Sequence, residues 1–287
     1  MRRRTLLAGA IVPAGRAARG QPRPPNGVDA TLGTAPIEVI GEWHGSAPHS
    51  VLTVVTRMRA VSLAGIALLS DRQPGTLRVD GRTSGPPRLR LHFDNEPYAW
   101  ITLDAGGRAW CQLAYQFGHE LGHVLCNSWR QDWKLNPSNW LEEALVEAFS
   151  IRGLGRLADS WGSDPPFPGD QAYGNAVRSY RDDLVTKYRA YAAEQNADRD
   201  LAAWFQARRG ALEAGGGIVG PAREAVSAML DELNADPRGI EALGAVNRWP
   251  DRSGALLEEY LTLWLRSCTA LGASKRLPSR LRERLLG

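Results

Sequence analysis

The chain has little cysteine and histidine, and it lacks a long hydrophobic run. A membrane-spanning helix needs about 20 consecutive apolar residues, and no stretch of the 287 residues approaches that length, which excludes a stable membrane span. The three cysteines cannot all pair with one another. Cys111 and Cys126 fall in one predicted helix, about 22 Å apart at the normal helical rise, beyond the reach of a disulfide. We therefore expect free buried thiols. Pairing of Cys268 with one of them stays open, and so does the redox compartment.

Outside the first 25 residues the chain has no excess of positive charge. The formal net charge is +4, and the first 25 residues contribute six positive charges and no acid. Subtracting six from four leaves about −2 for the remainder, so the body of the chain gives no electrostatic case for binding nucleic acid. The six positive charges belong to Arg2, Arg3, Arg4, Arg16, Arg19 and Arg23.

Residues 1–25 have the composition of an export signal. A cationic start precedes a short apolar run that ends at Val12, and the paired arginines favour the twin-arginine route. The alternative is a disordered basic tail. We expect an exported protein, periplasmic or secreted, with a cytoplasmic location as the alternative. No cysteine follows the apolar run, which excludes a bacterial lipoprotein anchor. Residues 20–36, rich in proline and glycine, are predicted to be a linker.

Residues 109–126 contain the pattern H-E-x-x-H, formed by His119, Glu120 and His123. The segment is predicted to be a helix because apolar residues recur at helical spacing. Histidines four residues apart project from one face of a helix, one turn from each other. The apolar stripe consists of Trp110, Leu113, Ala114, Phe117, Leu121, Val124 and Leu125.

Two imidazoles at this spacing can bind one tetrahedral Zn²⁺ and leave room for a third protein ligand and a water. Glu120 follows the first histidine, where its carboxylate can reach that water and act as a general base. An isolated H-E-x-x-H also arises by chance on exposed helices. The zinc hypothesis therefore needs a third ligand.

A third ligand is present in residues 139–150, which are predicted to form a second helix. Asn139 and Glu142 have the spacing of a capping box, which assigns Glu142 to the helix start. Glu143 and Glu147 share the opposite face. Glu143 can ligate the metal, and Glu147 can accept a hydrogen bond from a ligand histidine and so fix its tautomer.

Two glycines on the first helix favour a close approach of the second. Gly118 and Gly122 lie four residues apart on one face, and their missing side chains leave room for a neighbouring backbone. The second helix has its own apolar stripe, Leu141, Ala144, Leu145 and Ala148.

Together these motifs resemble those of the gluzincin zinc metallopeptidases, the group of thermolysin and the membrane-alanyl-type aminopeptidases. The resemblance covers roughly residues 99–150. It implies that Glu143, about twenty residues beyond His123, is the third zinc ligand, with Trp140 and Leu141 matching the aminopeptidase form. It also implies that Glu147 is the acidic residue that holds a ligand histidine in thermolysin-like enzymes.

Other metal sites fit the sequence less well. A metzincin would have glycine and histidine where Cys126 and Trp129 stand, and a di-iron bundle needs a second Glu-x-x-His. The G-x-M-E-N signature of the aminopeptidases is absent, and residues 104–107 (Asp-Ala-Gly-Gly) occupy its neighbourhood. Aminopeptidase activity is therefore in doubt, and endopeptidase activity or a specialised substrate stays open.

The expected fold class is α+β, in which a small mixed sheet lobe precedes a helical lobe. Residues 26–160 form the sheet lobe with the zinc-binding helices, and residues 161–287 form the helical lobe. Strands are predicted at 37–43, 76–79, 88–93 and 100–104. A helix is predicted at 49–60, and others at 171–194, 200–208, 221–234 and 254–271.

The gluzincin resemblance also assigns roles around the site. It implies that the last strand, residues 100–104, is a sheet edge with which the substrate backbone pairs; an ordinary core strand is the alternative. It further implies an oxyanion-stabilising tyrosine or histidine in the helical lobe. No histidine follows His123, so Tyr173 and Tyr180 are the candidates, with a structural role as the default.

Two further features have simpler interpretations. Residues 161–170 contain three prolines and a tryptophan, and we expect them to form a rigid wall over the site. His44, His49 and His92 have no partner at ligand spacing and are interpreted as structural or surface residues.

The sequence thus predicts zinc-dependent hydrolysis of peptide bonds, with Glu120 as the base and a peptide or protein as the substrate. Two alternatives stay open. One is a zinc-bearing protein that binds peptides or has a structural role without hydrolysing them, and the other is hydrolysis of a non-peptide amide or an epoxide. The oligomeric state does not follow from the sequence.

Overall fold

The computed structural model describes residues 32–67, 70, 72–82, 84–90, 97–130, 137–214, 222–249 and 254–287. The predicted export signal or basic tail, most of the predicted linker, and His92 lie outside the described residues. The fold is 61% helical, with a small mixed sheet on the N-terminal side followed by helices. The α+β prediction is therefore confirmed.

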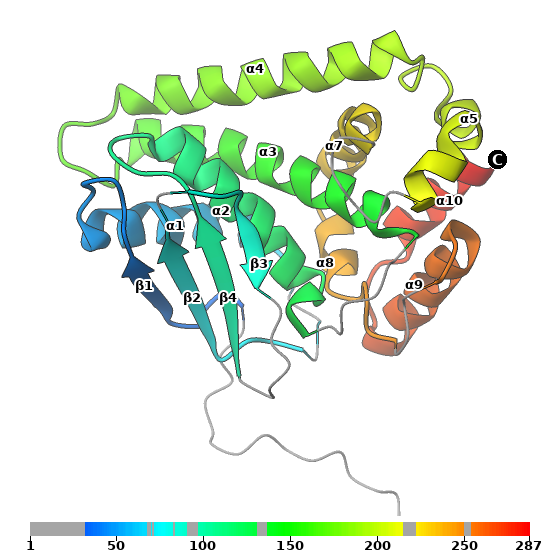
Figure 1. Cartoon of the computed structure of the whole chain (residues 1–287), viewed down its shortest axis with the longest axis horizontal. Coiled ribbons are helices and arrows are strands. Elements are labelled where there is room, and N and C mark those ends of the chain that lie inside the picture. Colours follow the sequence, from blue (N-terminus) through cyan, green and yellow to red (C-terminus); the bar gives the residue numbers. More distant parts are fainter. Residues whose placement is uncertain are drawn as a thin grey trace, which may run out of the picture.

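A four-stranded sheet forms one side of the molecule (Figure 1). Its strands are β1 (Ile37–Gly41), β2 (Thr76–Gly81), β3 (Arg88–Arg90) and β4 (Tyr98–Leu103), and their order across the sheet is β1-β2-β4-β3. The β1–β2 and β2–β4 pairs are parallel, and β3 runs antiparallel to β4.

The prediction that residues 100–104 form the sheet edge is wrong. In β4, Ile101 aligns with Val79 of β2 on one side and with Leu89 of β3 on the other. The chain passes outward through β3 before it returns to insert β4, and this places the most buried residues of β4 inside the sheet. Ala99, Ile101 and Leu103 are fully buried. In the described part of the sheet, the strand beside β4 at the edge is β3.

Helices α1 (Pro48–Leu63) and α2 (Trp110–Leu125) cover one face of the sheet (Figure 1). Residues alternate along β2 between buried and half-buried, as a sheet covered on one face requires. Every residue of the apolar stripe predicted for α2 is buried. Gln116 fixes α2 to the end of β4, because its amide accepts from Asp104 N and donates to Asp104 O, both at 3.0 Å.

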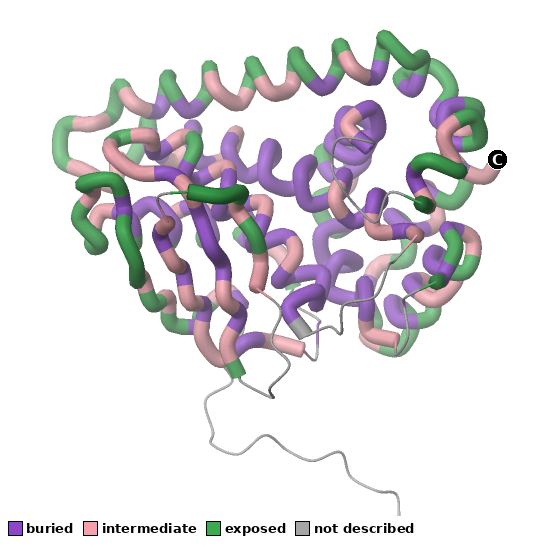
Figure 2. The backbone as a smooth tube through the Cα atoms, viewed as in Figure 1, coloured by how far each residue is buried: buried purple, intermediate pink, exposed green. Residues whose placement is uncertain are grey.

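The central helix is α3 (Asn139–Ser163), which is longer than predicted. Its predicted apolar stripe is buried, and so are most residues on its other faces (Figure 2). A helix buried all round belongs to the interior of a protein. Helix α4 (Tyr173–Glu194) packs along it, as Figure 1 shows.

The predicted close approach of α2 and α3 is confirmed. A Cβ atom placed on Gly122 would lie 2.8 Å from Cβ of Val146, and one placed on Gly118 would lie 2.8 Å from Oγ of Ser150. Both distances are shorter than van der Waals contact allows, so these positions of α2 accommodate only glycine at the observed separation.

The remaining helices form the C-terminal side of the molecule (Figure 1). Helices α5, α7 and α9 correspond to predicted helical segments, whereas α8 and α10 were not predicted from the sequence pattern, and neither was the short η1 turn between α2 and α3. None of the described helices is long and apolar enough to cross a membrane. The bounds are Ser128–Arg130 (η1), Leu201–Ala214 (α5), Arg223–Ala225 (η2), Val226–Ala235 (α7), Gly239–Leu243 (α8), Leu257–Leu271 (α9) and Arg276–Leu286 (α10).

One hydrophobic core runs from the sheet to the last helix, with Leu32 and Leu285 among its fully buried members. The three cysteines are free, as predicted: Cys126 and Cys268 are buried and Cys111 is half-buried.

The helix contact generates a stability prediction. Gly122→Ala should lower the free energy of unfolding by about 1–3 kcal/mol, since the clash with Val146 outweighs the gain in helix propensity of about 1 kcal/mol. Gly210→Ala in α5 is the matched control, because a Cβ there meets nothing within 4 Å. It should leave the protein equally stable or more stable in urea unfolding. A Gly122→Ala protein as stable as the control would contradict the described contact.

Candidate metal centre

Helices α2 and α3 bring together His119, His123 and Glu143. Nε2 of His119 lies 3.4 Å from Oε2 of Glu143, and Nε2 of His123 lies 3.4 Å from Oε1 of the same carboxylate. The centroids of the two imidazole rings are 5.0 Å apart. All three side chains are half-buried. Among the described residues, this is the one group of three or more potential ligands with donor atoms close enough to share an ion.

The spacing of these donor atoms fits a tetrahedral zinc ion. With metal–ligand distances of about 2.0–2.2 Å, neighbouring ligand atoms lie about 3.3–3.5 Å apart. Both Nε2–oxygen distances are 3.4 Å, which also exceeds the range of about 2.7–3.2 Å typical of N–H···O hydrogen bonds. The two nitrogens thus face the Glu143 carboxylate without closing on it, each opposite a different oxygen, and ligand atoms of the three side chains lie within 4.8 Å of one another.

The other nitrogen of each imidazole is held by a buried carboxylate. Nδ1 of His119 lies 2.8 Å from Glu147, and Nδ1 of His123 lies 2.7 Å from Glu142. The hydrogen bond expected of Glu147 is therefore present in the structure. With Nδ1 donating to a carboxylate, each ring keeps the Nε2 lone pair available for a metal.

The capping role predicted for Glu142 is wrong. The N-cap residue of α3 is Ser138, whose side chain makes no capping hydrogen bond. Glu142 is only 1% exposed and points toward α2, where its carboxylate binds His123. A capping residue would instead face solvent at the start of the helix. Asn139, the other half of the predicted box, instead donates to Glu143 at 3.4 Å.

The Glu147 carboxylate is held by two tyrosines besides His119. Tyr188 of α4 donates to Oε1 at 2.6 Å, and Tyr115 of α2 donates to the same oxygen. Burial raises the pKa of Glu147, but the bonds from His119 and the tyrosines outweigh it, so the carboxyl is held below its usual range. Glu147 therefore stays ionised.

The Glu142 carboxylate is also held from both halves of the chain. Asn247 donates to Oε2 at 2.7 Å, and Ser128 donates to Oε1. Sequence reasoning missed Asn247, Ser128 and Tyr188, because a local pattern gives no sign of contacts across such separations. Tyr115 was detectable, since it lies four residues before His119 on the same helical face.

The carboxylates govern the protonation of the imidazoles. Burial lowers the pKa of His119, but Glu143 and Glu147 more than offset it and raise the pKa to about 10. Burial likewise lowers the pKa of His123, and Glu143 and Glu142 raise it well above its ordinary value. Burial alone would raise the pKa of Glu143, but the two imidazoles hold it far below its usual range. Without a metal, these shifts favour the doubly protonated imidazolium form of both rings.

Glu120 lies beside the cluster and is 3% exposed. Burial raises its pKa above the ordinary value, partly offset by the two histidines and by the backbone of Leu89 in β3. A raised pKa favours a carboxylate that accepts and returns protons near neutral pH. Glu120 thus interacts both with the histidines of the cluster and with the backbone of β3.

The structure does not bring Tyr173 to this cluster. Its hydroxyl donates to Arg108 O at 2.9 Å and accepts from Trp110 N at 3.1 Å, so it holds the start of α2. His119 lies nine residues farther along the helix, about 14 Å away at the normal rise. These contacts are those of a structural tyrosine and do not support the oxyanion role for which Tyr173 was a candidate.

Tyr180 lies closer to the cluster but on its far side. Its ring packs edge-on against Tyr115 at 6.0 Å, and burial raises its pKa, with smaller contributions in the same direction from Cys111 and Glu147. This places it on the Nδ1 side of His119, away from the nitrogen that faces Glu143. The position does not support an oxyanion role.

The loop predicted to wall the site lies elsewhere. Trp161 belongs to the end of α3, and Phe167 packs between it and Trp110, with ring centroids 6.0 and 5.6 Å apart. The proline-rich segment thus covers the N-terminal end of α2, where the aromatic rings pack together. It does not cover the histidines.

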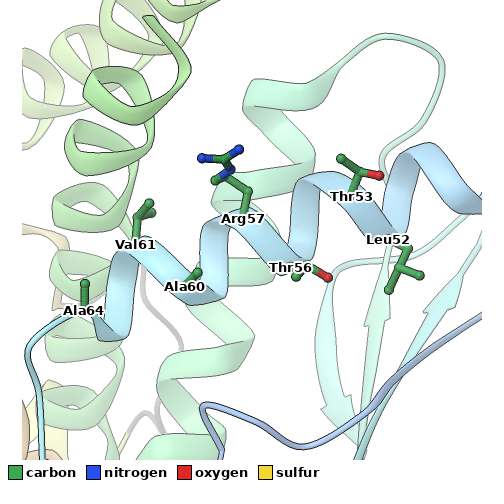
Figure 3. A pocket seen from close by; sticks show the side chains of 7 residues that line it. All are labelled: Leu52, Thr53, Thr56, Arg57, Ala60, Val61 and Ala64. Atoms are coloured by element: carbon green, nitrogen blue, oxygen red, sulfur yellow. The ribbon is translucent and has the colours of Figure 1, made fainter. Parts of the chain in front are cut away.

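Two surface features stand apart from the centre. His44 pairs with Asp104 at 3.1 Å in an exposed position and His49 is also exposed, as predicted for surface histidines. A shallow groove runs along α1 between Leu52 and Ala64 (Figure 3). Its lining belongs to α1 alone and shares no residue with the metal centre.

Comparison of the sequence with protein-family models and with curated proteins finds no match. The functional argument therefore rests on the motifs and on the geometry of the cluster.

The protonation of the cluster generates a prediction about metal binding. Zinc binds neutral imidazole, so its binding to the metal-free protein at pH 7 should release about two protons per ion. Calorimetric titration in buffers of different ionisation enthalpy measures this number. Stoichiometric zinc binding without proton release would show that the carboxylates do not keep the imidazoles protonated.

Proposed function

We propose that this protein is a zinc-dependent peptidase of the gluzincin type, with His119, His123 and Glu143 as metal ligands and Glu120 as general base. The observation that carries the proposal is the geometry in which both Nε2 atoms face the Glu143 carboxylate, with Glu120 beside the cluster. Two helices that pack together only to stabilise the fold need neither this arrangement of ligands nor a buried glutamate at position 120.

Electrostatics support a divalent cation at this site. The carboxylates of Glu120, Glu142, Glu143 and Glu147 lie around two imidazoles, and three of the four are at most 3% exposed. Buried carboxylates are stable only when they are paired, hydrogen-bonded or bound to a metal. When zinc is bound, both imidazoles are neutral and no longer balance the negative charge of the carboxylates. The two positive charges of Zn²⁺ would take over that role.

The proposed chemistry divides the work between the ion and the protein. A bound zinc ion would polarise the scissile carbonyl and lower the pKa of the attacking water. Glu120 takes a proton from that water and later delivers it to the leaving amine. Its buried carboxyl, whose pKa is raised by burial, suits a group that accepts a proton and later returns it. Glu142 and Glu147 keep the imidazoles in the tautomer that presents Nε2.

The edge strand supports a peptide as the substrate. We infer that an extended peptide pairs with β3 by backbone hydrogen bonds, since β3 ends the described sheet and its Leu89 lies next to Glu120. A peptide paired there would present its backbone to the general base.

Removal of the third ligand should abolish metal retention. Glu143→Ala deletes the one carboxylate that faces both Nε2 atoms, so the purified protein should contain less than about a tenth of the wild-type zinc by elemental analysis. Asp159→Ala, which removes an exposed carboxylate from the same helix, should keep one zinc per chain. Full zinc content in Glu143→Ala would show that the ligand assignment is wrong.

Removal of the base should separate metal binding from turnover. Glu120→Gln keeps the side-chain shape but cannot accept the proton, so zinc should stay bound while cleavage of a peptide library falls by at least about 10²-fold. If the variant cleaves at the wild-type rate, the peptidase mechanism is contradicted. If the zinc-loaded wild type cleaves no peptide, the site binds zinc without the proposed hydrolysis.

A further inference from the structure

Two fully buried asparagines join the end of α2 to the turn that follows α8. Asn127 has φ +64° and Asn247 has φ +59°, a left-handed conformation that asparagine tolerates better than most residues. Each residue directs its side-chain amide toward the segment that carries the other. The two form a reciprocal clamp, yet their partners differ.

Asn127 contacts the turn mainly through backbone. Its Nδ2 donates to Gly244 O at 3.0 Å and to Val246 O at 2.6 Å, and its Oδ1 accepts from Ser70 at 2.5 Å. None of these partners touches a candidate metal ligand. Asn127 therefore serves the connection between the two segments.

Asn247 reaches the metal centre. Its Nδ2 donates to Glu142 Oε2 at 2.7 Å and to Cys126 O at 3.0 Å, and also lies 3.2 Å from Ser128 Oγ. Its Oδ1 accepts from the Tyr260 hydroxyl at 3.0 Å. Because a carboxylate and a carbonyl accept but do not donate, only this orientation of the amide satisfies both ends.

Glu142 transmits this contact to the imidazole. Its Oε1 accepts from Nδ1 of His123, while its Oε2 is held by Asn247. With both oxygens fixed, the carboxylate has one orientation, and the ring of His123 aims Nε2 toward Glu143. Without the amide, Oε2 would be a buried acceptor with one donor fewer and the carboxylate could rotate away from the ring.

We propose that Asn247 is a positioning residue for the metal centre: through Glu142 it fixes the orientation of His123 and so raises the affinity for zinc. The inference rests on the proposed zinc site. It places a determinant of metal affinity in the C-terminal half of the chain, about 120 residues beyond the histidine that it orients.

The two asparagines supply a matched pair of variants. Asn247→Gly and Asn127→Gly each remove a buried amide at a position where glycine accepts the backbone conformation. Both should lose stability in urea. Zinc affinity of the full-length protein, measured by competition with a chromophoric chelator, should fall by about 10- to 100-fold in Asn247→Gly and by less than about 2-fold in Asn127→Gly.

A double-mutant cycle tests whether the effect passes through Glu142. In a Glu142→Gln background, Asn247→Gly should change zinc affinity by less than about 2-fold, because the carboxylate that it orients is gone. If the two changes in affinity add, or if Asn127→Gly weakens zinc binding as much as Asn247→Gly, the positioning role is overturned. If the wild type binds no zinc, the proposed function itself fails.

Aspartate variants keep the test valid if a glycine variant fails to fold. Asn247→Asp and Asn127→Asp keep the size and the tolerance for positive φ but remove the donors. If a glycine variant does not fold, the same difference in zinc affinity is expected between the aspartates. Equal affinities in that pair would also overturn the role of Asn247.

Discussion

The close approach of α2 and α3 is the constraint on which the candidate site depends. Gly122 lies against Val146, and Gly118 lies against Ser150, so α3 sits within the space that ordinary side chains would occupy. At that separation, residues one turn apart on α3 reach residues one turn apart on α2: Glu143 faces both Nε2 atoms, and Glu147 reaches the back of His119. A wider helix contact would leave the carboxylates too far away to hold the rings.

Carboxylates buried this close together need donors, and the whole chain supplies them. Tyr188 comes from α4 and Asn247 from the turn after α8, while Leu89 comes from the sheet. One continuous core fixes these elements relative to one another. The candidate metal ligands thus come from two neighbouring helices, whereas the residues that hold them in place come from the whole chain. A buried carboxylate with fewer donors would take up a proton and lose its hold on the imidazole.

The features of this arrangement that could be predicted from sequence are those set by residues close together in the chain. Helical periodicity predicts α2, the four-residue spacing places His119 and His123 on one face, and the paired glycines predict the helix contact. The sequence analysis was wrong where a residue's partner is distant. Glu142 was assigned to a helix cap because Asn139, three residues earlier, has capping-box spacing. Its carboxylate instead binds the buried imidazole of His123 on the neighbouring helix. Tyr173 was a candidate for the site with a structural role as the default, and its contacts are structural, since its hydroxyl holds the start of α2. Strand β4 was assigned to the edge, since chain order does not reveal that β3 lies outside it.

The central claim is that one zinc ion sits at the point faced by His119, His123 and Glu143. X-ray absorption at the zinc edge tests it most directly. The account predicts a first coordination shell of nitrogen and oxygen alone at about 2.0–2.2 Å, with the outer-shell scattering of two imidazoles. A sulfur shell at about 2.3 Å would instead place the ion on a cysteine such as Cys126, and the assignment of this centre would be contradicted.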